Sequence, residues 1–236
     1  MVRDANQDYC FASEKYPLFI VCDGMGGHAA GDVASRSAVE SISRYIDLNR
    51  KFDLDDKNAE SLMGGACKYA NSIVYSRSQT SSEYNGMGTT MDICLFDFEK
   101  LYVCHVGDSR VYLYRDNTLN QISCDHTLIN ELLKNGTITE EEAKTHPNRH
   151  MITRALGTED SIKYDFYSLD MADGDMILMC TDGLSNMLTE DEIKRVLLSA
   201  DDLRKAVTRL RDKANENGGA DNITAILIKY SEEEMR

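Results

Sequence analysis

Residues 18–24 read LFIVCDG, a short apolar run that ends in an aspartate and a glycine. Two more apolar runs also end at an aspartate beside a glycine, LYVCHVGD at residues 101–108 and MILMCTDG at residues 176–183. Short apolar runs bounded by polar residues or glycine are typical of buried strands. Strands that are apolar on both faces must be covered on both faces, which predicts packed sheets flanked by layers of helices.

The rest of the chain adds strands and amphipathic helices to this pattern. Strands are expected at residues 18–22, 91–98, 101–106, 176–180 and 222–230. Helical periodicity predicts three apolar stripes: Ala34, Ala38, Ile42, Tyr45 and Ile46; Leu62, Ala66, Tyr69 and Ile73; and Leu203, Ala206, Val207 and Leu210. A fourth helix is expected after Thr189, because Glu192 stands at capping-box spacing from it. Gly64 and Gly65 are expected to mark an irregularity in the second helix.

The composition excludes some classes of function. Lys and Arg number 26 against 40 Asp and Glu, a net charge of -14, so the average field repels nucleic acid and anionic lipid. We therefore expect neither nucleic acid nor a membrane as a partner. The seven cysteines include no C-x-x-C pair and mostly lie in apolar runs, which predicts small buried hydrophobes in a reducing compartment.

The organisation of the chain predicts one cytoplasmic domain that spans residues 1–236. Only Pro17 and Pro147 interrupt it, and no Ser/Gly/Pro linker, repeat or low-complexity block divides it. The first ten residues, MVRDANQDYC, carry charges where a secretory signal has an apolar stretch. No segment approaches the length that spans a bilayer.

Four aspartates share a position beside an apolar run: Asp23, Asp108 and Asp182 follow one, and Asp221 precedes the run NITAILI. Strands that deliver carboxylates at their ends gather negative charge in one place, which is unfavourable unless a cation binds there. Oxygen ligands without His or Cys spacing favour magnesium or manganese over zinc. Asp-Gly is also a common turn, so any single aspartate could equally cap a strand. The four together favour a metal site.

Eight stretches, in order along the chain, carry a family resemblance: VRDANQD (2–8), VCDGMGGHAAGDVAS (21–35), GMGTT (86–90), HVGDSRVYLYR (105–115), DHT (125–127), THPNRHMITRALG (145–157), CTDGLSNML (180–188) and ADNITAILI (220–228). The sequence resembles the metal-dependent Ser/Thr protein phosphatase family of type 2C, specifically its compact bacterial members. The resemblance implies an α+β fold, a four-layer α/β/β/α sandwich with two central antiparallel sheets. It also implies hydrolysis of phosphoserine and phosphothreonine in proteins by a metal-bridging hydroxide, without a covalent phosphoenzyme.

The same resemblance assigns ligands for two ions, Mn²⁺ or Mg²⁺. Asp23 matches the carboxylate that bridges both ions, and the backbone carbonyl of Gly24 matches a ligand of one of them. Asp182 and Asp221 match ligands of the other ion. Two neighbouring cations lower the pKa of a shared water and screen the charge on phosphoryl oxygens.

Further roles follow from matching positions. Asp8 matches an acid that contacts the ions largely through water, and Asp108 matches a ligand of a third, weaker ion in the bacterial members. Arg3 matches the phosphate-binding arginine, whose planar fork of donors fits two phosphate oxygens. His28 is the candidate for protonating the leaving group, with a structural role at a helix start as the equal alternative. Gln7 stands where many members have glutamate, so one outer carboxylate is absent.

The resemblance also predicts features of the N-terminus, a flap beside the site and the partners of the protein. The chain begins almost at Arg3, so the N-terminal strand of the family is expected to be missing. Residues 125–154 are expected to form a mobile flap beside the site that influences substrate choice. The implied partners are phosphorylated proteins and a bacterial Ser/Thr kinase of the eukaryotic-like type, and a monomer is expected.

Three other interpretations compete with this one. Cys104 and Arg110 have the C-x5-R spacing of cysteine-dependent phosphatases. That chemistry needs a phosphate-cradling loop that leads into a helix, whereas VYLYR predicts a strand and favours core packing of Cys104. GMGGHAAG lacks the spacing and the lysine of nucleotide-binding loops. The alternative function is a catalytically weak or inactive pseudophosphatase that binds phosphoproteins, and the retained Asp23, Asp182 and Asp221 argue against it.

Overall fold

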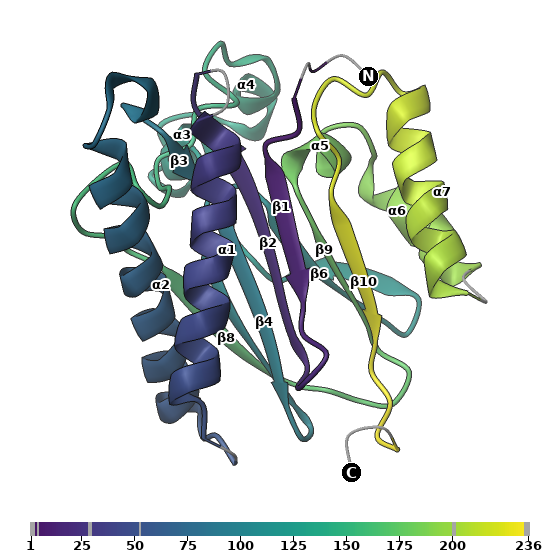
Figure 1. Cartoon of the computed structure of the whole chain (residues 1–236). Coiled ribbons are helices and arrows are strands. Elements are labelled where there is room, and N and C mark those ends of the chain that lie inside the picture. Colours follow the sequence, from purple (N-terminus) through teal and green to yellow (C-terminus); the bar gives the residue numbers. More distant parts are fainter. Residues whose placement is uncertain (1–2, 4, 28–29, 52, 200–201, 234–236) are drawn as a thin grey trace.

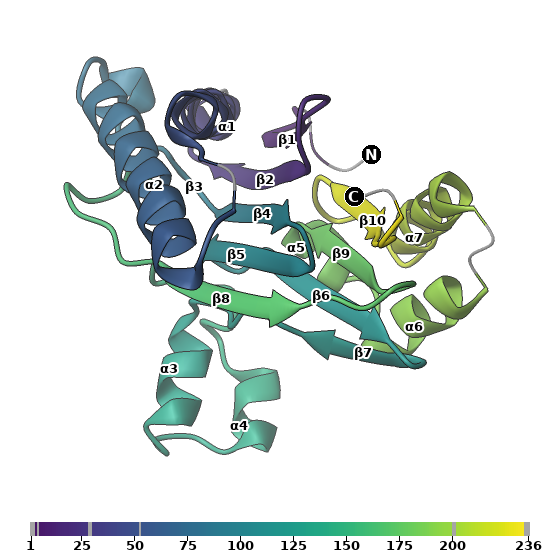
Figure 2. The ribbon, with the colours of Figure 1, turned by 90° about the horizontal axis from the view of Figure 1, so that it is seen from below.

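The computed structural model describes residues 3, 5–27, 30–51, 53–199 and 202–233. Two antiparallel sheets lie face to face in its centre, and helices cover the outer face of each sheet (Figure 1). Seen from below, the molecule consists of helices, a sheet, a second sheet and more helices (Figure 2). The α/β/β/α sandwich that the sequence predicts is therefore confirmed.

The first sheet has six strands, and its neighbouring strands are antiparallel. In spatial order it contains β1 (Asp8–Ala12), β2 (Leu18–Met25), β4 (Met91–Asp97), β5 (Lys100–Val106) and β8 (Asp165–Asp170), and the short β3 (Gly88–Thr89) pairs with β2. Every residue of β4 is buried, as are all residues of β5 except Lys100. These inner strands are covered on both faces, as the apolar runs predict.

The second sheet has four antiparallel strands. In spatial order they are β10 (Ala225–Lys229), β9 (Met176–Cys180), β6 (Arg110–Arg115) and β7 (Thr118–Gln121). An apolar core joins this sheet to the first one, with Val21, Phe96 and Val103 on one side and Val111, Ile177 and Met179 on the other. This shared core sets the distance between the two sheets.

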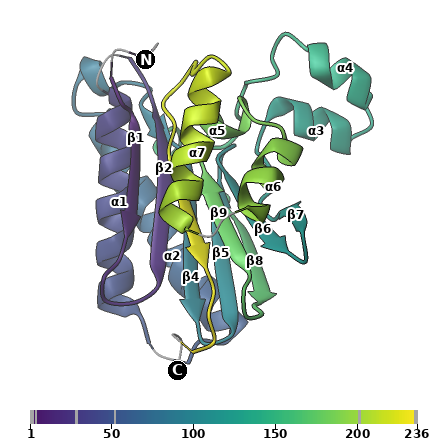
Figure 3. The ribbon, with the colours of Figure 1, turned by 90° about the vertical axis from the view of Figure 1, so that its right-hand side faces the viewer.

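The helices form the outer layers. α1 (Ala30–Asn49) and α2 (Asp56–Ser78) cover the first sheet, and α5 (Asp182–Ser185), α6 (Glu190–Leu198) and α7 (Leu203–Glu216) cover the second. Each layer packs on its sheet through its own apolar cluster. A 3-10 turn at Ser82–Tyr84 follows α2, while α3 (Leu128–Lys134) and α4 (Glu140–Thr145) project away from the sheets (Figure 3). Among the helices of the described ranges, none has the length and apolar character needed to cross a bilayer.

The capping box predicted at the start of α6 is confirmed. The Thr189 hydroxyl accepts a hydrogen bond from the Glu192 N–H at 3.3 Å, and the Glu192 carboxylate accepts one from the Thr189 N–H at 2.9 Å. Two backbone donors that the helix start leaves unpaired are satisfied in this way. The sequence therefore locates this helix start correctly from two residues.

The prediction for α2 is confirmed for Leu62 and Ala66, which are buried, and is wrong in two other respects. Tyr69 and Ile73 are exposed, and their neighbours Ala70 and Val74 are buried in their place. Gly64 and Gly65 lie inside an unbroken helix rather than at an irregularity. A Cβ atom at Gly64 would lie 2.1 Å from the Tyr164 hydroxyl oxygen, and one at Gly65 would lie 2.5 Å from that of Tyr45. The two glycines thus make room for two tyrosines, which no helical periodicity reveals.

Ile177 provides a test of the core between the sheets, because its side chain is fully buried there. Ile177→Ala should lower the free energy of unfolding by about 2–5 kcal/mol, since it removes buried methyl groups and leaves a cavity. Leu48 on α1 is exposed, and Leu48→Ala, the matched control, should change that free energy by less than about 0.5 kcal/mol. Urea unfolding measures both variants, and equal effects would contradict this packing.

Candidate metal centre

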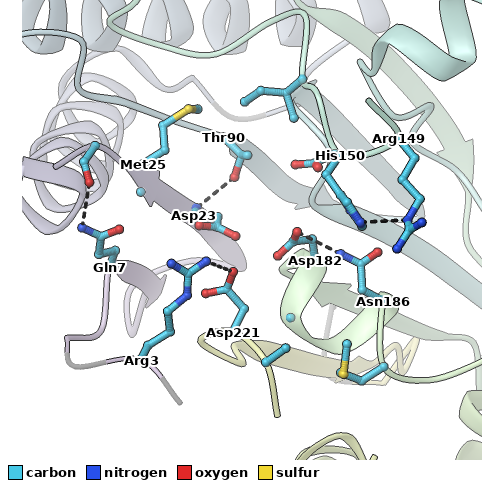
Figure 4. Close-up of a pocket in the computed structure, with 17 residues that line it drawn as sticks. Arg3, Gln7, Asp23, Met25, Thr90, Arg149, His150, Asp182, Asn186 and Asp221 are labelled. Carbon is cyan, nitrogen blue, oxygen red and sulfur yellow. Dashed lines mark hydrogen bonds and ion pairs between the residues drawn. The ribbon is translucent and has the colours of Figure 1, made fainter. Parts of the chain in front are cut away.

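A pocket of about 900 Å³ lies where the two sheets and the segment after α4 meet. Its lining includes these sequence-predicted site residues: Arg3, Asp23, Gly24, Asp108, Asp182 and Asp221. The side chains of Arg3, Asp23, Asp182 and Asp221 face a common space, with Arg149 and His150 across from them (Figure 4). Asp8 lies buried beside the pocket rather than in its lining. His28 lies outside the described residues.

Asp23 lies within β2 rather than at its end, because the strand continues through Gly24 and pairs with β3. Two threonines of the GMGTT stretch hold its backbone. The Asp23 N–H donates to the Thr90 hydroxyl at 2.8 Å, and the Asp23 carbonyl accepts from the Thr90 N–H at 2.9 Å and from the Thr89 hydroxyl at 2.8 Å. The Thr90 hydroxyl also lies 2.8 Å from that of Ser109. Thr90 thereby links Asp23 to the loop that carries Asp108.

The glycine after Asp23 is required by a close approach of three backbone segments. A Cβ atom at Gly24 would lie 2.0 Å from the carbonyl oxygen of Gly31 and 2.5 Å from that of Gln7. The Gly24 N–H donates to the Gln7 carbonyl at 3.0 Å. At this position the glycine is required by packing, and the aspartate supplies the carboxylate of the pocket. The alternative, a simple Asp-Gly turn that ends the strand, is wrong here because β2 continues to Met25.

A second Asp-Gly pair brings the ends of β9 and β10 together. Asp182 is the first residue of α5, one residue past the end of β9, and a Cβ atom at Gly183 would lie 1.9 Å from the carbonyl oxygen of Asn222. The Asn222 side chain accepts from the Gln7 N–H at 2.9 Å and donates to the Ala5 carbonyl at 3.1 Å. Asn222 thus fastens the segment before β1 next to Asp221.

Asp8 connects the first sheet to the second. It stands opposite Asp23 in the β1–β2 register, and its Oδ2 accepts from the Thr181 hydroxyl at 3.0 Å. The Thr181 hydroxyl accepts in turn from the Thr224 N–H at 3.1 Å. In the described part of the chain, Oδ1 of Asp8 and Oδ1 of Asp182 are buried and have no hydrogen-bond partner. Such orphaned acceptors are costly unless a cation or a donor reaches them.

The acids of the pocket raise one another's pKa values. Burial and the neighbouring Asp8, Asp182, Asp108 and Asp221 raise the pKa of Asp23 well above its ordinary value. Burial, followed by the charge of Asp182, raises the pKa of Asp108 to about 7. Burial also raises the pKa of Asp8 to about 6, although hydrogen bonds from threonines oppose it. The charged form of each carboxyl group is therefore destabilised, and a bound metal ion would stabilise that form.

Arg3 approaches the acids from the N-terminal side. Its Nη2 donates to Asp221 Oδ2 at 2.6 Å, and this ion pair is partly exposed. Within the described ranges, no three Asp, Glu, His or Cys side chains converge tightly enough to form a complete ligand set by themselves. The donors nevertheless fit a hard divalent cation, because they are oxygens only, two of them are unpaired and buried, and their charges repel one another.

Cys104 is a core residue, as expected. It lies in β5, fully buried, and burial raises the pKa of its thiol well above the ordinary value. Arg110 begins β6, so the segment after Cys104 leads into a strand rather than a helix. Arg110 binds Asp125, with Nη2 2.7 Å from Oδ2. The interpretation as a cysteine-dependent phosphatase is wrong, because the thiolate and the phosphate-binding helix that it needs are both missing from this segment.

Sequence reasoning missed several residues that support the site. Thr90, Thr181 and Asn222 act through backbone and side-chain hydrogen bonds whose partners are distant in the chain. Each belongs to one of the stretches that carry the family resemblance. The stretch alone does not show which partner its polar side chain binds. Arg149 and His150, whose Nε and Nε2 atoms lie 2.9 Å apart, line the pocket from the segment after α4. The sequence places both residues in the predicted flap, and no pattern in it assigns them to the site.

The comparisons with known proteins agree with this geometry. The protein phosphatase 2C family matches residues 3–227. The serine/threonine phosphatase stp of Listeria welshimeri is 37% identical over 92% of this chain and 85% of its own length. The Streptococcus agalactiae serine/threonine phosphatase structure is 34% identical, covers 97% of this chain and 95% of that one, and has a TM-score of 0.89.

A further solved structure concerns the metal. The catalytic domain of the serine/threonine protein phosphatase PstP in complex with two manganese ions is 32% identical, covers 98% of this chain and 94% of that one, and has a TM-score of 0.83. The chain therefore belongs to the protein phosphatase 2C family of metal-dependent serine/threonine protein phosphatases, which confirms the resemblance carried by its motifs. The phosphatase stp of Listeria welshimeri and the protein phosphatase PhpP of Streptococcus pneumoniae are both bacterial proteins.

Gly183 tests whether close packing positions the acids. Gly183→Ala should lower the free energy of unfolding by about 1–3 kcal/mol, because the new Cβ atom meets the fixed carbonyl of Asn222. Gly27→Ala is the control, since among the described residues not adjacent to it none places an atom within 4 Å of a Cβ atom there. Urea unfolding of the metal-free protein measures both. A Gly183→Ala variant as stable as Gly27→Ala would show that the segments can separate without cost.

Proposed function

We propose that this chain hydrolyses phosphoserine and phosphothreonine in proteins with the help of two divalent ions, Mn²⁺ or Mg²⁺. Asp23 would bridge the ions, the Gly24 carbonyl would bind one, and Asp182 with Asp221 would bind the other. When bound, the ions supply the positive charge that activates water and screens phosphoryl oxygens. The observation that carries this proposal is the burial of Asp23 among other carboxylates, which raises its pKa and favours a cation.

Two other acids complete the proposed ligand set. Asp8 is buried next to the pocket with one carboxylate oxygen unpaired, which suits contact with the ions through water. Asp108 lines the pocket in the loop between β5 and β6, which suits a third, weaker ion. Gln7 occupies the position beside Asp8 with a neutral amide, and its side chain lies 3.4 Å from the Gly26 carbonyl. A neutral residue there leaves one less carboxylate around the ions.

Arg3 is proposed to bind the phosphoryl group. Its guanidinium lies at the pocket and is oriented by Asp221. A planar guanidinium can donate two parallel hydrogen bonds to phosphate oxygens, which a lysine in the same place could not. The leaving serine or threonine oxygen needs a proton as the bond to phosphorus breaks. His28 remains our candidate for that proton donor, on the strength of its place in GMGGH after β2.

The segment 125–154 is proposed to be the flap of a single catalytic domain that spans the chain. Its two helices project away from the sheets (Figure 3), while Arg149, His150 and Ile152 near its end line the pocket. A peptide that carries a phosphorylated side chain into the pocket would pass this segment. We propose that phosphorylated proteins are the substrates, that a bacterial Ser/Thr kinase is the functional partner, and that the protein acts as a cytoplasmic monomer.

Asp23→Asn gives the sharpest test, because it should change stability and activity in opposite directions. The amide is isosteric and uncharged, so the metal-free variant should unfold at a higher urea concentration than the wild type. The same variant should lose at least ~100-fold in Mn²⁺-dependent hydrolysis of a phosphothreonine peptide, since the ions lose their shared ligand. It should also gain less stability from added Mn²⁺ than the wild type.

The controls separate the proposed function from its alternatives. Cys104→Ser should retain nearly full activity, because the buried thiol takes no part in the reaction. A wild-type protein that binds phosphothreonine peptide but does not turn it over with Mn²⁺ would be the pseudophosphatase. Equal turnover by Asp23→Asn and the wild type would reject the metal mechanism altogether.

Arg149→Ala tests the flap as a contact for protein substrates. The variant should raise KM for a phosphothreonine peptide about fivefold, the size expected of an exposed charged contact. It should leave kcat/KM for p-nitrophenyl phosphate nearly unchanged, because that small ester has no peptide chain. Lys144→Ala is the control in the same segment, since Lys144 pairs with Glu141 and does not line the pocket. Equal losses on both substrates would assign Arg149 to the phosphate instead.

A further inference from the structure

Two buried histidines pack against each other at the base of the flap, and one of them contacts the loop that carries Asp108. The ring centroids of His105, in β5, and His126, after β7, lie 4.7 Å apart, with an angle of 34° between the rings. His105 is fully buried and His126 is 4% exposed. Both belong to stretches that carry the family resemblance, HVGDSR and DHT, yet the proposed chemistry assigns a role to neither.

The two rings differ in their hydrogen-bond partners. His105 Nδ1 lies 2.7 Å from Asp92 Oδ1, and its Nε2 lies 3.2 Å from the Cys124 carbonyl oxygen. The Cys124 carbonyl can only accept, so Nε2 carries a proton, and His105 Nδ1 and Asp92 Oδ1 share a second proton across their contact. Burial lowers the pKa of His105, but the charge and hydrogen bond of Asp92 raise it above its ordinary value. Burial also raises the pKa of Asp92.

The ring of His126 is neutral. Its Nδ1 accepts a hydrogen bond from the Gly107 N–H at 3.0 Å, so its single ring proton lies on Nε2. Burial, followed by the charges of His105 and Arg154, lowers the pKa of His126 to about 4. Nε2 lies 3.0 Å from Arg154 Nη1 and 3.3 Å from Asp165 Oδ2, and the same Nη1 donates to Asp165 Oδ1 at 2.9 Å.

His126 contacts Gly107 twice and also joins the two ends of the flap. Besides the bond to Nδ1, the His126 N–H donates to the Gly107 carbonyl at 2.7 Å. The His126 carbonyl accepts from the Thr153 N–H at 2.8 Å, next to Arg154. Gly107 has φ of +115°, and a Cβ atom there would lie 2.6 Å from the Thr90 side chain. The chain before Asp108 is therefore held between Thr90 and His126.

We propose that His126 is a positioning residue that holds the Gly107–Asp108 loop of the pocket in register with the base of the flap. This inference rests on the proposed role of Asp108 at the metal centre. One ring nitrogen fixes the loop, the other faces the Asp165–Arg154 pair at the far end of the flap, and the ring of His105 packs against that of His126. A shift of the flap base is thereby passed to the Gly107–Asp108 loop through one residue, by its backbone and by its ring.

Three substitutions separate the two ends of the ring. His126→Asn places an amide oxygen near Nδ1 and can still accept from the Gly107 N–H, while His126→Gln reaches toward Nε2 and leaves that N–H unpaired. His126→Phe keeps a ring without either nitrogen. Amide hydrogen exchange at Gly107 in the metal-free protein should accelerate about tenfold in the Phe and Gln variants and stay near the wild-type rate in the Asn variant, as one lost hydrogen bond predicts.

Mn²⁺ binding, measured by the electron paramagnetic resonance signal of the free ion, gives a second readout. The Phe and Gln variants should need about tenfold more Mn²⁺ for half-saturation of the weakest site, and the Asn variant should bind like the wild type. His146→Asn is the control, a flap histidine that does not line the pocket. If His126→Phe fails to fold, the contrast between Asn and Gln carries the same information.

The outcomes distinguish positioning from packing and from failure of the proposed function. Unchanged Gly107 exchange in the Gln variant, or equal changes in the Asn and Gln variants, would overturn the positioning role. Altered Gly107 exchange with unaltered Mn²⁺ binding would overturn the link to Asp108. A wild-type protein without Mn²⁺-dependent turnover would instead refute the proposed function, and the exchange measurements would still decide what His126 holds.

Discussion

Repulsion among buried carboxylates is the constraint on which this structure depends. Asp8 and Asp23 face each other on neighbouring strands of the first sheet, and Asp182 and Asp221 stand beside strands of the second. Burial raises the pKa values of Asp8, Asp23 and Asp182 most, and the charge of a neighbouring aspartate adds to each. Among the residues that the structure describes, none donates a hydrogen bond to the unpaired oxygens of Asp8 and Asp182. The rest of the fold must supply enough stability to hold these groups together until a cation binds.

The apolar core between the sheets therefore affects the geometry of the pocket. Because the acids come from both sheets, the distance between the two pairs is set by the packing of side chains such as Val21 and Ile177. The Thr181–Asp8 hydrogen bond crosses from one sheet to the other at the pocket, and Asn222 ties the segment before β1 to the second sheet. The site is therefore as rigid as the inter-sheet core, whereas the projecting helices α3 and α4 take no part in that core.

The sequence predicts the layers, most inner strands and the acids, because each leaves a local pattern. Burial on both faces gives an unbroken apolar run such as 18–22, and the capping box at Thr189 lies within four residues. The roles of Thr90, Asn222 and His126 could not be predicted in this way, since each acts on a partner far along the chain. Gly64 was misjudged for the same reason, because the tyrosine that it accommodates is distant in sequence.

Charge balance in the pocket also bears on the order of binding. A phosphate dianion that enters the metal-free pocket meets the carboxylates of Asp23, Asp108, Asp182 and Asp221, with Arg3 already paired to one of them. The protein as a whole carries a net charge of -14, so its average field does not attract a phosphorylated partner. Two divalent ions would bring four positive charges, which balances these four carboxylates and weakens the hold of Asp221 on Arg3. Electrostatics alone therefore favours metal binding before a phosphate dianion enters the pocket.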